Sequence, residues 1–593
     1  MAEKNTYRQD ERLEEPFDIR HLLLASAYIK KYIKQMGLAL FLSILGGALG
    51  LLAPIITQKA IDDALIHPDI KLLIILSVLL VSVYAVSILF TTIRSKMMVK
   101  VSQRIIYDIR KDLFAHLQKL SFQYYDDRPH GKILIRVVNY VNSVSDMLSN
   151  GLINIILETI NLVIIIIYMF MVDVQMSLVV LCGVPILAVF MLWMKNRQRK
   201  AWQAVSNKSS NLNAYLQENI VGARITQIFA RENENAKVFE GLSEDCRRTW
   251  MKAVRCNNLM WPGIDAISVL IRAAIFLFGI MVFAEGSKSI GTIIAISGYS
   301  ARFWQPIMNM GNIFNNFLNN MAYLERIFET MDEKVTVADV ENAGEMPEIK
   351  GHVEFKNVSF SYEEGKEVLH DVSFDVQPGM SIALVGPTGA GKSTIVNLIS
   401  RFYNVEKGQV LIDGQDISKV TLQSLRSQMG IMMQDSFIFS GTIRDNIAYG
   451  KLDATDKEIE EASVKVCADA FIKKMPGGYN TEVKERGSLL SQGQKQLISF
   501  ARTLISDPKI LILDEATSSI DVQTEKALQE GLNKMLKGRT SFIVAHRLST
   551  IRNCDRIMYI DDGGIVETGN HEELMAKHGA YYKLYTTQIE EIA

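Results

Sequence analysis

Apolar residues are distributed unevenly along the chain, and its long apolar runs lie before residue 320. Six of these runs approach the roughly 20 residues that a helix needs to cross a bilayer. So many long runs are rare in soluble folds, so we expect membrane spans rather than the buried helices of a large soluble protein. The expected spans cover about 37–56, 72–93, 152–172, 176–194, 264–284 and 290–314.

The positive charges between the spans indicate the orientation of the chain. Lys and Arg crowd the long connections after the second and fourth spans, whereas the opposite connections carry only Lys59, Lys71 and Lys288. Because cytoplasmic loops are enriched in Lys and Arg, we expect both long connections and both termini to be cytoplasmic. The long connections have a helical pattern, so the spans should project into the cytoplasm. Residues 19–34 are amphipathic and should form an interfacial elbow helix.

Four ionisable residues fall within the expected spans. A charged side chain is costly in the hydrocarbon region, so these groups should face a cavity or each other. They could line a polar translocation pathway, or they could form ion pairs that only fix the helix packing. Aromatic Tyr299, Phe303 and Trp304 surround the last of them and would suit an amphipathic or cationic organic ligand. The four residues are Glu158, Asp265, Arg272 and Arg302.

The composition fits a chain divided between an apolar part and a soluble part. Of its 593 residues, 48% are hydrophobic and 22% are charged, and the length is too great for one ordinary domain. The net charge of −1 provides no field for a polyanion, so we expect no nucleic-acid partner. The five cysteines have no CxxC spacing, which favours free thiols over a disulfide scaffold or a zinc site.

The soluble part contains a phosphate-binding loop. The segment ALVGPTGAGKST matches GxxxxGK[ST] and lies between an apolar strand pattern and a helical pattern. Its backbone N–H groups can wrap the phosphates of ATP, the Lys392 amine can reach the β/γ oxygens, and the Ser393 hydroxyl can ligate Mg²⁺. The predicted nucleotide-binding residues are Gly386, Pro387, Thr388, Gly389, Ala390, Gly391, Lys392, Ser393 and Thr394.

Further candidate residues follow other apolar strand patterns. Asp514 and Glu515 end the run ILIL, where Asp514 can support the Mg²⁺ shell and Glu515 can polarise the attacking water. Gln434 is a candidate for both Mg²⁺ binding and catalysis, since its amide can reach the metal and the water. His546, after SFIVA, can contact the γ-phosphate. Tyr362, upstream of the phosphate-binding loop, could stack on adenine.

In this order the motifs resemble those of an ABC transporter of the exporter type, a half-transporter with six membrane helices. Walker A, Q-loop, signature, Walker B, D-loop and H-loop all occur, and the resemblance covers nearly the whole chain. It implies an α-helical membrane domain followed by an α/β P-loop ATPase domain, in contact with membrane lipid. It also places coupling helices near 126–131 and 214–222. The predicted domains are a cytoplasmic N-terminus with the elbow helix (1–36), the transmembrane domain (37–325), a linker (326–350) and the nucleotide-binding domain (351–593).

The segment LLSQGQKQLISFAR resembles the family signature LSGGQ, but Gln492 stands where the first glycine is usual. In this family the signature of one subunit caps the nucleotide held by the Walker motifs of the other, at a helix N-terminus. Ser491, Gly493 and Gln494 remain, so phosphate contact is expected, whereas Gln492 should impair closure. Lys484 also replaces a usual glycine, which bears on the coupling contact of its loop.

A complete Walker side beside an altered signature resembles the catalytically competent half of asymmetric bacterial multidrug exporters. We therefore predict a heterodimer in the plasma membrane of a bacterium, with cytoplasmic ATPase domains. Its partner half-transporter should have an intact signature and lack the catalytic glutamate. The predicted function is ATP-driven export of amphipathic compounds. The alternatives are a lipid or peptide exporter, or an ATP-gated channel or sensor of the same fold.

Overall fold

The chain divides into two units, which we treat in turn. The first comprises Met1–Leu117 and His130–Asp332, and the second comprises Gln118–Pro129 and Glu333–Ala593. The computed structural model describes residues 19–65, 69–147, 151–284, 289–363, 365–433, 436–514, 522–545 and 548–592.

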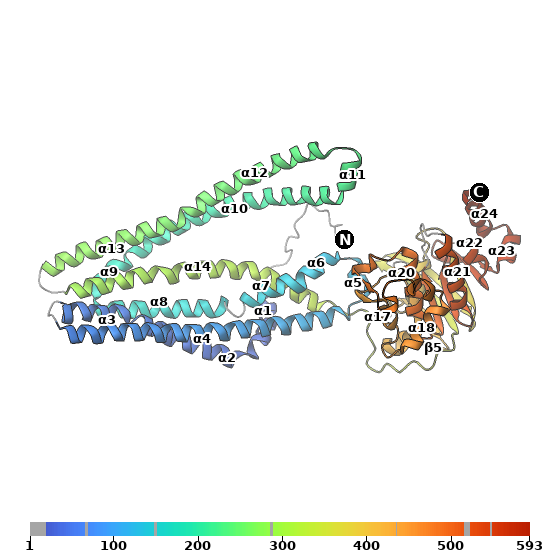
Figure 1. Ribbon diagram of the computed structural model, residues 1–593, viewed down its shortest axis with the longest axis horizontal. Coiled ribbons are helices and arrows are strands. Elements are labelled where there is room, and N and C mark those ends of the chain that lie inside the picture. The colour runs from blue at the N-terminus through green and yellow to red at the C-terminus, as the bar shows by residue number, and fades with distance from the viewer. Residues whose placement is uncertain are drawn as a thin grey trace. The chain divides into compact units, whose positions relative to one another are not determined.

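The described residues of the first unit form helices joined by loops (Figure 1). A helix, α1, occupies most of the segment expected to form the elbow, and just after it the Lys31 amine lies 2.6 Å from Asp108 Oδ2 on α4. The helices are α1 (Ile19–Lys30), α2 (Ile33–Gly50), α3 (Ala53–Lys59), α4 (Ile70–Leu117), α6 (His130–Ile135), α7 (Val141–Asp146), α8 (Leu152–Val172), α9 (Val174–Leu181), α10 (Gly183–Val221), α11 (Ala223–Ile228), α12 (Glu232–Asn258), α13 (Met260–Ala284) and α14 (Ile290–Asp332), with π-helical turns at Ala60–Leu65 and Arg136–Tyr140.

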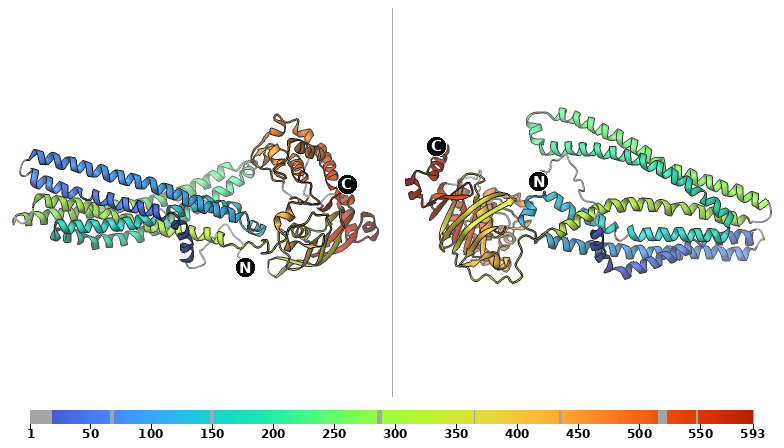
Figure 2. Two further views of the ribbon diagram at one scale, coloured as in Figure 1. Left: turned by 90° about the horizontal axis from the view of Figure 1, so that it is seen from below. Right: turned by 180° about the vertical axis from the view of Figure 1, so that it is seen from behind.

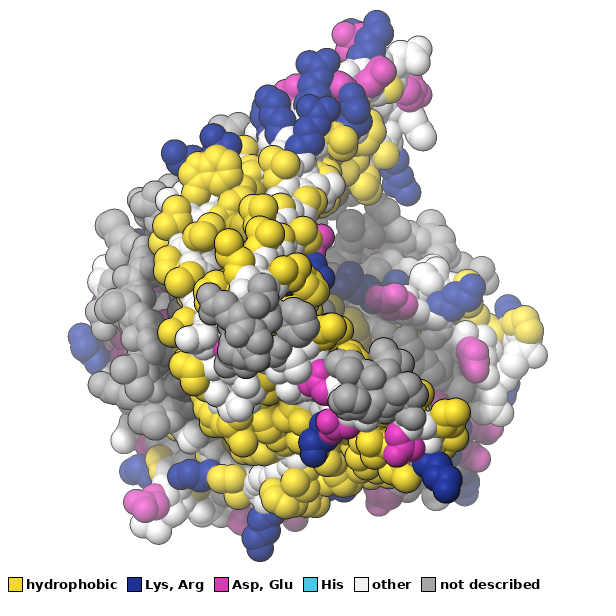
Figure 3. Space-filling model, turned by 90° about the vertical axis from the view of Figure 1, so that its left-hand side faces the viewer, with side chains coloured by type: hydrophobic (Ala, Val, Ile, Leu, Met, Phe, Trp, Pro, Cys, Tyr) yellow, Lys and Arg dark blue, Asp and Glu magenta, His cyan; other side chains and the backbone are white. Residues whose placement is uncertain are grey.

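Among the described residues, five helical segments are long and apolar enough to cross a membrane: Ile33–Ala64, Ile70–Leu117, Ile153–Val172, Val174–Val221 and Glu232–Met281. They correspond to the first five expected spans. The sixth expected span lies on α14, which is not among them, because polar residues such as Arg302 and Gln305 interrupt its apolar stretch. Apolar side chains cover much of the surface of the first unit at the end shown in Figure 3.

The long connection after the fourth span forms an antiparallel pair of helices, α10 and α12, joined by the short helix α11 (Figure 1). The segment expected to carry the second coupling helix, 214–222, is instead mostly the continuous last part of α10. Gly222 caps α10, and the separate short helix follows at Ala223–Ile228. A separate short helix thus follows the expected segment directly, and the position of the coupling contact stays a prediction.

The second unit is an α/β domain built on three sheets (Figure 2). A six-stranded sheet has the order β12-β11-β3-β10-β9-β6, a four-stranded sheet has the order β2-β1-β4-β5, and β7 pairs with β8. The strands are β1 (Val353–Glu363), β2 (Lys366–Val376), β3 (Ser381–Val385), β4 (Lys407–Ile412), β5 (Gln415–Asp416), β6 (Met429–Met432), β7 (Gly441–Thr442), β8 (Glu482–Val483), β9 (Ile510–Asp514), β10 (Thr540–Val544), β11 (Arg556–Asp561) and β12 (Gly564–Gly569). The helices are α5 (Phe122–Asp126), α15 (Lys392–Ile399), α16 (Leu422–Arg426), α17 (Ile443–Ala448), α18 (Asp456–Lys465), α19 (Asp469–Ile472), α20 (Gln492–Leu504), α21 (Val522–Leu536), α22 (Leu548–Arg552), α23 (His571–Lys577) and α24 (Ala580–Ile592).

All strands of the six-stranded sheet except β12 are largely buried, which explains why they read as mainly apolar runs. On β9, Leu511 and Leu513 belong to one core cluster, whereas Ile510 and Ile512 belong to the other. The first cluster also contains apolar residues of α17, α18 and α20, and the second contains residues of α15 and the four-stranded sheet. The inner strands are therefore held between two packed layers, and ligands of such a sheet bind at its strand ends.

Candidate nucleotide site

Four neighbouring parallel strands, β3, β10, β9 and β6, end at the same edge of the six-stranded sheet. Val544 pairs with both Leu384 and Asp514, so these three strands are in register up to their carboxyl ends. We call this the strand-end edge. Ligands of open parallel sheets bind beyond the carboxyl ends of the strands. The pairing thus brings four separate sequence motifs to one place.

The three predicted catalytic residues follow strands that end at the strand-end edge. Gln434 comes two residues after β6, Glu515 directly after β9, and His546 two residues after β10. All three lie outside the described residues, so their side-chain roles stay predictions. Asp514, the last residue of β9, is described and partly buried.

The phosphate-binding loop joins β3 to α15 and depends on glycine at particular points. Gly386, Gly389 and Gly391 all have positive φ angles, of +143°, +86° and +102°. A Cβ atom at Gly386 would collide with the carbonyl oxygen of Ile560, and one at Gly391 would lie 2.7 Å from Leu369 Cδ2. Only glycine fits such a conformation and such close packing without strain. The local sequence is therefore matched to this loop shape.

Lys392, the first residue of α15, is buried inside the loop. Its ammonium group donates hydrogen bonds to the carbonyl oxygens of Gly386 and Pro387, at 3.0 and 2.7 Å. Burial lowers the pKa of the Lys392 amine, and the negative charge of Asp514 opposes that shift. An ammonium group has three donors, so it can hold the loop closed and exchange these carbonyl acceptors for phosphate oxygens.

The donor set at the strand-end edge suits Mg²⁺ with a phosphate ligand. Ser393 is exposed next to Lys392, and Asp514 ends the strand two places across the sheet. Within the described ranges, no group of three or more His, Cys, Asp and Glu side chains could hold a metal ion. Mg²⁺ commonly binds one or two protein oxygens together with phosphates and waters, rather than an all-protein cage. The residues present therefore fit Mg²⁺ carried with a nucleotide.

Tyr362 lies on β1 beside the helix that follows the loop. Its hydroxyl donates to Thr394 Oγ1 of α15 at 3.2 Å. The ring is half-buried and meets the rings of Phe360 and Tyr403 edge-on, with centroid distances of 4.9 and 5.0 Å. The predicted adenine-stacking residue is thus held next to the phosphate-binding helix, and stacking itself stays a prediction.

Helix α5, from the first long connection, packs on the same part of the second unit. The ring of Phe122 lies 4.3 Å from that of Phe402. The Tyr403 hydroxyl donates to Asp126 Oδ2 at 3.1 Å, and Gln123 Nε2 donates to the carbonyl oxygen of Tyr362 at 3.3 Å. This contact involves residues 122–126, slightly before the segment 126–131 expected to carry the first coupling helix. The contact connects residues 122–126 to the strand that bears Tyr362.

The signature segment forms the N-terminus of α20. Ser491 caps the helix, with its Oγ accepting the Gln494 N–H at 3.3 Å, while Gln494 Oε1 accepts the Ser491 N–H at 3.0 Å. Gln492 occupies the first helical position and is exposed, whereas Gly493 is buried. Lys484 is exposed just before the short turn that leads into this segment. The helix terminus is thus well formed, but a long side chain stands where a small residue is usual.

Arg502, at the other end of α20, is a residue that sequence reasoning missed. Its guanidinium donates to the carbonyl oxygen of Phe437 and to the carbonyl and side-chain oxygens of Asn446, each at 2.8 Å. Burial lowers its pKa from the usual range. Phe437 follows Gln434 by three residues, so Arg502 ties the signature helix to the segment after the Q-loop. The signal that could have identified Arg502 was a charged residue within the run QLISFARTL, which is largely buried.

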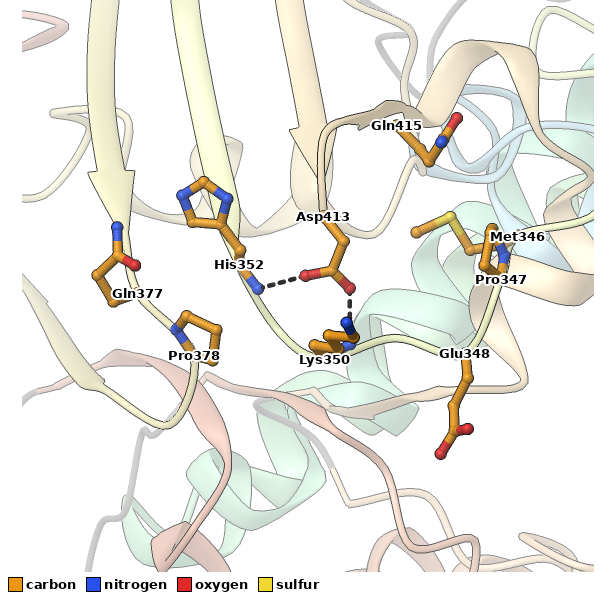
Figure 4. Close-up of a pocket in the computed structure, with 9 residues that line it drawn as sticks. All are labelled: Met346, Pro347, Glu348, Lys350, His352, Gln377, Pro378, Asp413 and Gln415. Carbon is orange, nitrogen blue, oxygen red and sulfur yellow. Dashed lines mark hydrogen bonds between the residues drawn. The ribbon is translucent and has the colours of Figure 1, made fainter.

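A cavity of about 490 Å³ lies elsewhere in the second unit (Figure 4). There Asp413 accepts hydrogen bonds from the backbone N–H groups of Lys350 and His352, at 2.6 and 2.9 Å. These bonds fasten the end of the linker to the four-stranded sheet. None of the predicted site residues lines this cavity, so it is separate from the strand-end edge.

Comparisons with known proteins cover both units. The family model described as the ABC transporter transmembrane region matches residues 36–307, and the model described as ABC transporter matches residues 369–518. The chain is 41% identical over 596 residues to the uncharacterized ABC transporter ATP-binding protein YknV of Bacillus subtilis, covering 100% of this chain and 99% of that protein. It is 40% identical over 527 residues to the probable multidrug resistance ABC transporter ATP-binding/permease protein YheH of Bacillus subtilis, covering 88% of this chain and 78% of that protein. The solved structure of a bacterial Atm1-family ABC exporter with ATP bound is 29% identical, with a TM-score of 0.76, and the match covers 94% of this chain and 98% of that one.

Proposed function

The chain belongs to the ABC transporter family, and we propose that it exports amphipathic compounds as one half of a heterodimer. The expected fold class, a helical membrane domain followed by an ATPase domain, is confirmed, as is the exporter type. The protein is an ATPase, since its ATPase domain is the one with which ABC transporters bind and hydrolyse ATP. The proposal adds the cargo, the partner and an inequality between the two ATP sites.

The N-terminus of α20 is the observation that carries the proposal. A helix N-terminus attracts phosphate because its N–H groups are open and its dipole is favourable. Glycine would let that backbone approach the phosphate closely, but Gln492 adds an exposed side chain there. The N–H of Ser491 is already bonded to the side chain of Gln494. These features support a weakened ATP site where this signature meets the Walker motifs of a partner.

The Walker side of this chain has the components of a competent site. Lys392 and Asp514 lie at the strand-end edge, and the sequence continues directly into Glu515. When bound, Mg²⁺ would neutralise phosphate charge, held by Ser393 and Asp514. A partner with an intact signature would complete this site. Two copies of this chain would instead repeat the altered signature at both sites, which favours a different partner.

Exposed apolar residues support the proposal that a second subunit covers part of this chain. Ile225 and Ile228 of α11, with Phe229 after it, are 62%, 77% and 70% exposed. They lie at the tip of the α10–α12 pair, in a connection expected to be cytoplasmic. An apolar tip in water is a typical protein contact. We place the heterodimer in the bacterial plasma membrane with its ATPase domains in the cytoplasm.

Amphipathic cargo is supported by the name of one relative, a probable multidrug resistance transporter. Lipid or peptide export, or ATP gating of a channel, would be compatible with the same fold. Purification from native membranes, followed by native mass spectrometry, tests the partner. We expect a complex of this chain with a second half-transporter that lacks the catalytic glutamate. A homodimer with full ATPase activity would refute the heterodimer.

The cargo is tested separately with inside-out vesicles that contain the purified complex. We expect ATP-dependent accumulation of an amphipathic dye against its gradient, lost in the Glu515→Gln variant. Accumulation of lipid or peptide without the dye would favour those cargoes. Dye movement only down its gradient would favour the gated channel.

A further inference from the structure

Two of the four ionisable residues in the spans lie near each other. Arg272 Nη2 lies 4.0 Å from Asp265 Oδ1, and both residues belong to α13. They are two helical turns apart, so long side chains on one face bring the opposite charges together. This pair keeps its charges balanced within one helix and does not require a ligand.

Arg302 has a structural task that the sequence does not reveal. Helix α2 ends at Gly50, four residues before Pro54, which has no N–H to donate to the Gly50 carbonyl. Arg302 Nη1 donates to that carbonyl oxygen at 2.7 Å, and the Tyr299 hydroxyl donates to the next one, of Leu51, at 2.6 Å. Arg302 and Tyr299, one turn apart on α14, therefore donate hydrogen bonds to the carbonyl oxygens at the break between α2 and α3.

The surroundings of Arg302 also balance its charge. Carbonyl groups at a helix C-terminus carry partial negative charge, and a cation is stabilised there. Its other terminal nitrogen, Nη2, donates to the Tyr84 hydroxyl of α4 at 2.7 Å. These contacts give Arg302 a role in holding three helices together, and its role in a translocation pathway stays a prediction. Both terminal nitrogens already have acceptors within the protein.

Glu158 has a neutral amide, not a cation, as its described hydrogen-bond partner. It lies in the second turn of α8, the helix Leu152–Val172, and is half-buried. Its Oε1 accepts a hydrogen bond from the neutral amide of Asn309 at 2.7 Å, and Asn309 Oδ1 accepts one from Gln305 at 3.0 Å. Helices α8 and α14, which provide these residues, lie side by side (Figures 1 and 2).

Among the described contacts, a cation meets α8 one helical turn before Glu158. Arg94 Nη1 lies 3.4 Å from Asn154 Oδ1, four residues before Glu158 on the same face of α8. Arg94 makes no ion pair with Glu158 within 4.0 Å among the described residues. A hydrogen bond from a neutral amide orients a carboxylate but does not neutralise it, and an uncompensated charge at membrane depth is costly.

A row of neutral amides continues from Glu158 along α14. Gln305, Asn309, Asn312 and Asn316 have spacings of three or four residues, so they share one helix face. All but Asn309 are exposed in this chain. Amides on lipid-facing surface would leave polar groups without partners, so this face borders protein or water instead. Arg302, one turn before Gln305, lies on the same face, where its terminal nitrogens bind Gly50 and Tyr84, and Glu158 of α8 brings a carboxylate to Asn309.

We propose that Glu158, oriented by Asn309, binds the cationic group of the transported compound, so that this exporter selects organic cations over anions of the same shape. The inference rests on the proposed export of amphipathic compounds and adds the charge of the cargo. Binding of a cation restores neutrality beside the α14 amides. An anion of the same shape would be repelled by the Glu158 carboxylate, while the two described arginines of this region are engaged elsewhere, Arg302 at the break after α2 and Arg94 at Asn154.

The test compares two ions of nearly equal size and opposite charge, tetraphenylphosphonium and tetraphenylborate, on the purified transporter complex in lipid nanodiscs. Tetraphenylphosphonium has no hydrogen-bond donor, so the Glu158 carboxylate attracts it by charge alone, and such an attraction is stronger at a partly buried site than in bulk water. We therefore expect Glu158→Gln to weaken tetraphenylphosphonium binding at least about tenfold, with tetraphenylborate binding unchanged or tighter. Asp265→Asn is the matched control, since it also removes a span carboxylate, and it should leave both affinities unchanged.

A second measurement uses the wild-type protein, so it does not depend on the folding of a variant. A carbodiimide that modifies membrane carboxyl groups should label Glu158, and mass spectrometry of peptides reports the extent. We expect tetraphenylphosphonium to slow the labelling of Glu158 and tetraphenylborate not to do so. Equal protection by both ions, or wild-type affinity of Glu158→Gln for the cation, overturns the inference.

The outcomes also separate this inference from the proposed function. If Glu158→Gln binds the cation normally and vesicles still accumulate amphipathic dyes, only the charge selection is wrong. If the wild-type complex binds neither ion and accumulates no dye, the proposed export of amphipathic compounds fails and this inference fails with it.

Discussion

The two ATP sites of the complex should respond unequally to the loss of single side chains of this chain. Lys392 belongs to the site built on its own Walker motifs, where its ammonium makes two hydrogen bonds, of 3.0 and 2.7 Å. When phosphate oxygens replace those carbonyls, each charge-assisted bond contributes about 1.5–3 kcal/mol. Losing both in Lys392→Ala removes about 3–6 kcal/mol, which corresponds to roughly 10²- to 10⁴-fold in turnover.

Ser491 belongs to the site on the partner's Walker motifs. Ser491→Ala removes a neutral hydroxyl that contributes about 0.5–1.5 kcal/mol to a phosphate contact. It also removes the cap of α20, whose bond to the Gln494 N–H is 3.3 Å long, at about 0.5–2 kcal/mol of helix stability. Because that site already turns over slowly in our proposal, steady-state hydrolysis should keep most of its rate. The loss should appear as faster release of nucleotide from the weak site.

Steady-state ATPase assays on both variants, in the same partnered complex, decide the matter. Lys392→Arg and Ser491→Thr are matched controls, since the first keeps the positive charge and the second keeps a capping hydroxyl. Nucleotide retention after rapid gel filtration reports the weak site. Equal and nearly complete loss of hydrolysis in both alanine variants would mean that both sites are catalytic and would refute the unequal arrangement.

Three further results are expected. Glu515→Gln should lower ATP turnover by about 10²- to 10⁴-fold with nucleotide binding retained, as for the loss of a general base; turnover within a few-fold of wild type would exclude that role. Gly386→Ala should abolish nucleotide binding, measured with a fluorescent ATP analogue, because its Cβ would collide with the Ile560 carbonyl oxygen. Gly389→Ala has open space around its Cβ and should cost only the strain of its positive φ, about 1 kcal/mol. Equal loss of nucleotide binding in the two variants would contradict this reasoning. Tyr403→Phe removes the bond to Asp126 and should reduce cargo-stimulated ATPase activity while basal activity persists; unchanged stimulation would argue against α5 as a transmitting contact.

Sequence alone predicted those features that depend on neighbouring residues. The spans follow from the length and apolarity of continuous runs, and five of them are helices suited to a membrane. The loop before α15 was predictable because a strand, three glycines at positive φ and a lysine occur within a dozen residues. The order of motifs identified the family for the same reason, since each motif is a local pattern.

The tertiary structure decided what depends on residues far apart in the chain. The partner of Arg302 is a carbonyl 252 residues earlier, exposed by a proline in another helix, and no local pattern announces that bond. Arg502 reaches Phe437 across 65 residues, and α5 reaches Tyr403 across 277 residues between Asp126 and that tyrosine. Hydrophobicity and turn chemistry act over a few residues and can be read in order. The pairing of polar groups depends on which helices pack together, so only the fold could distinguish Arg302, which completes a broken helix, from Glu158, whose described contact is with the amide of Asn309.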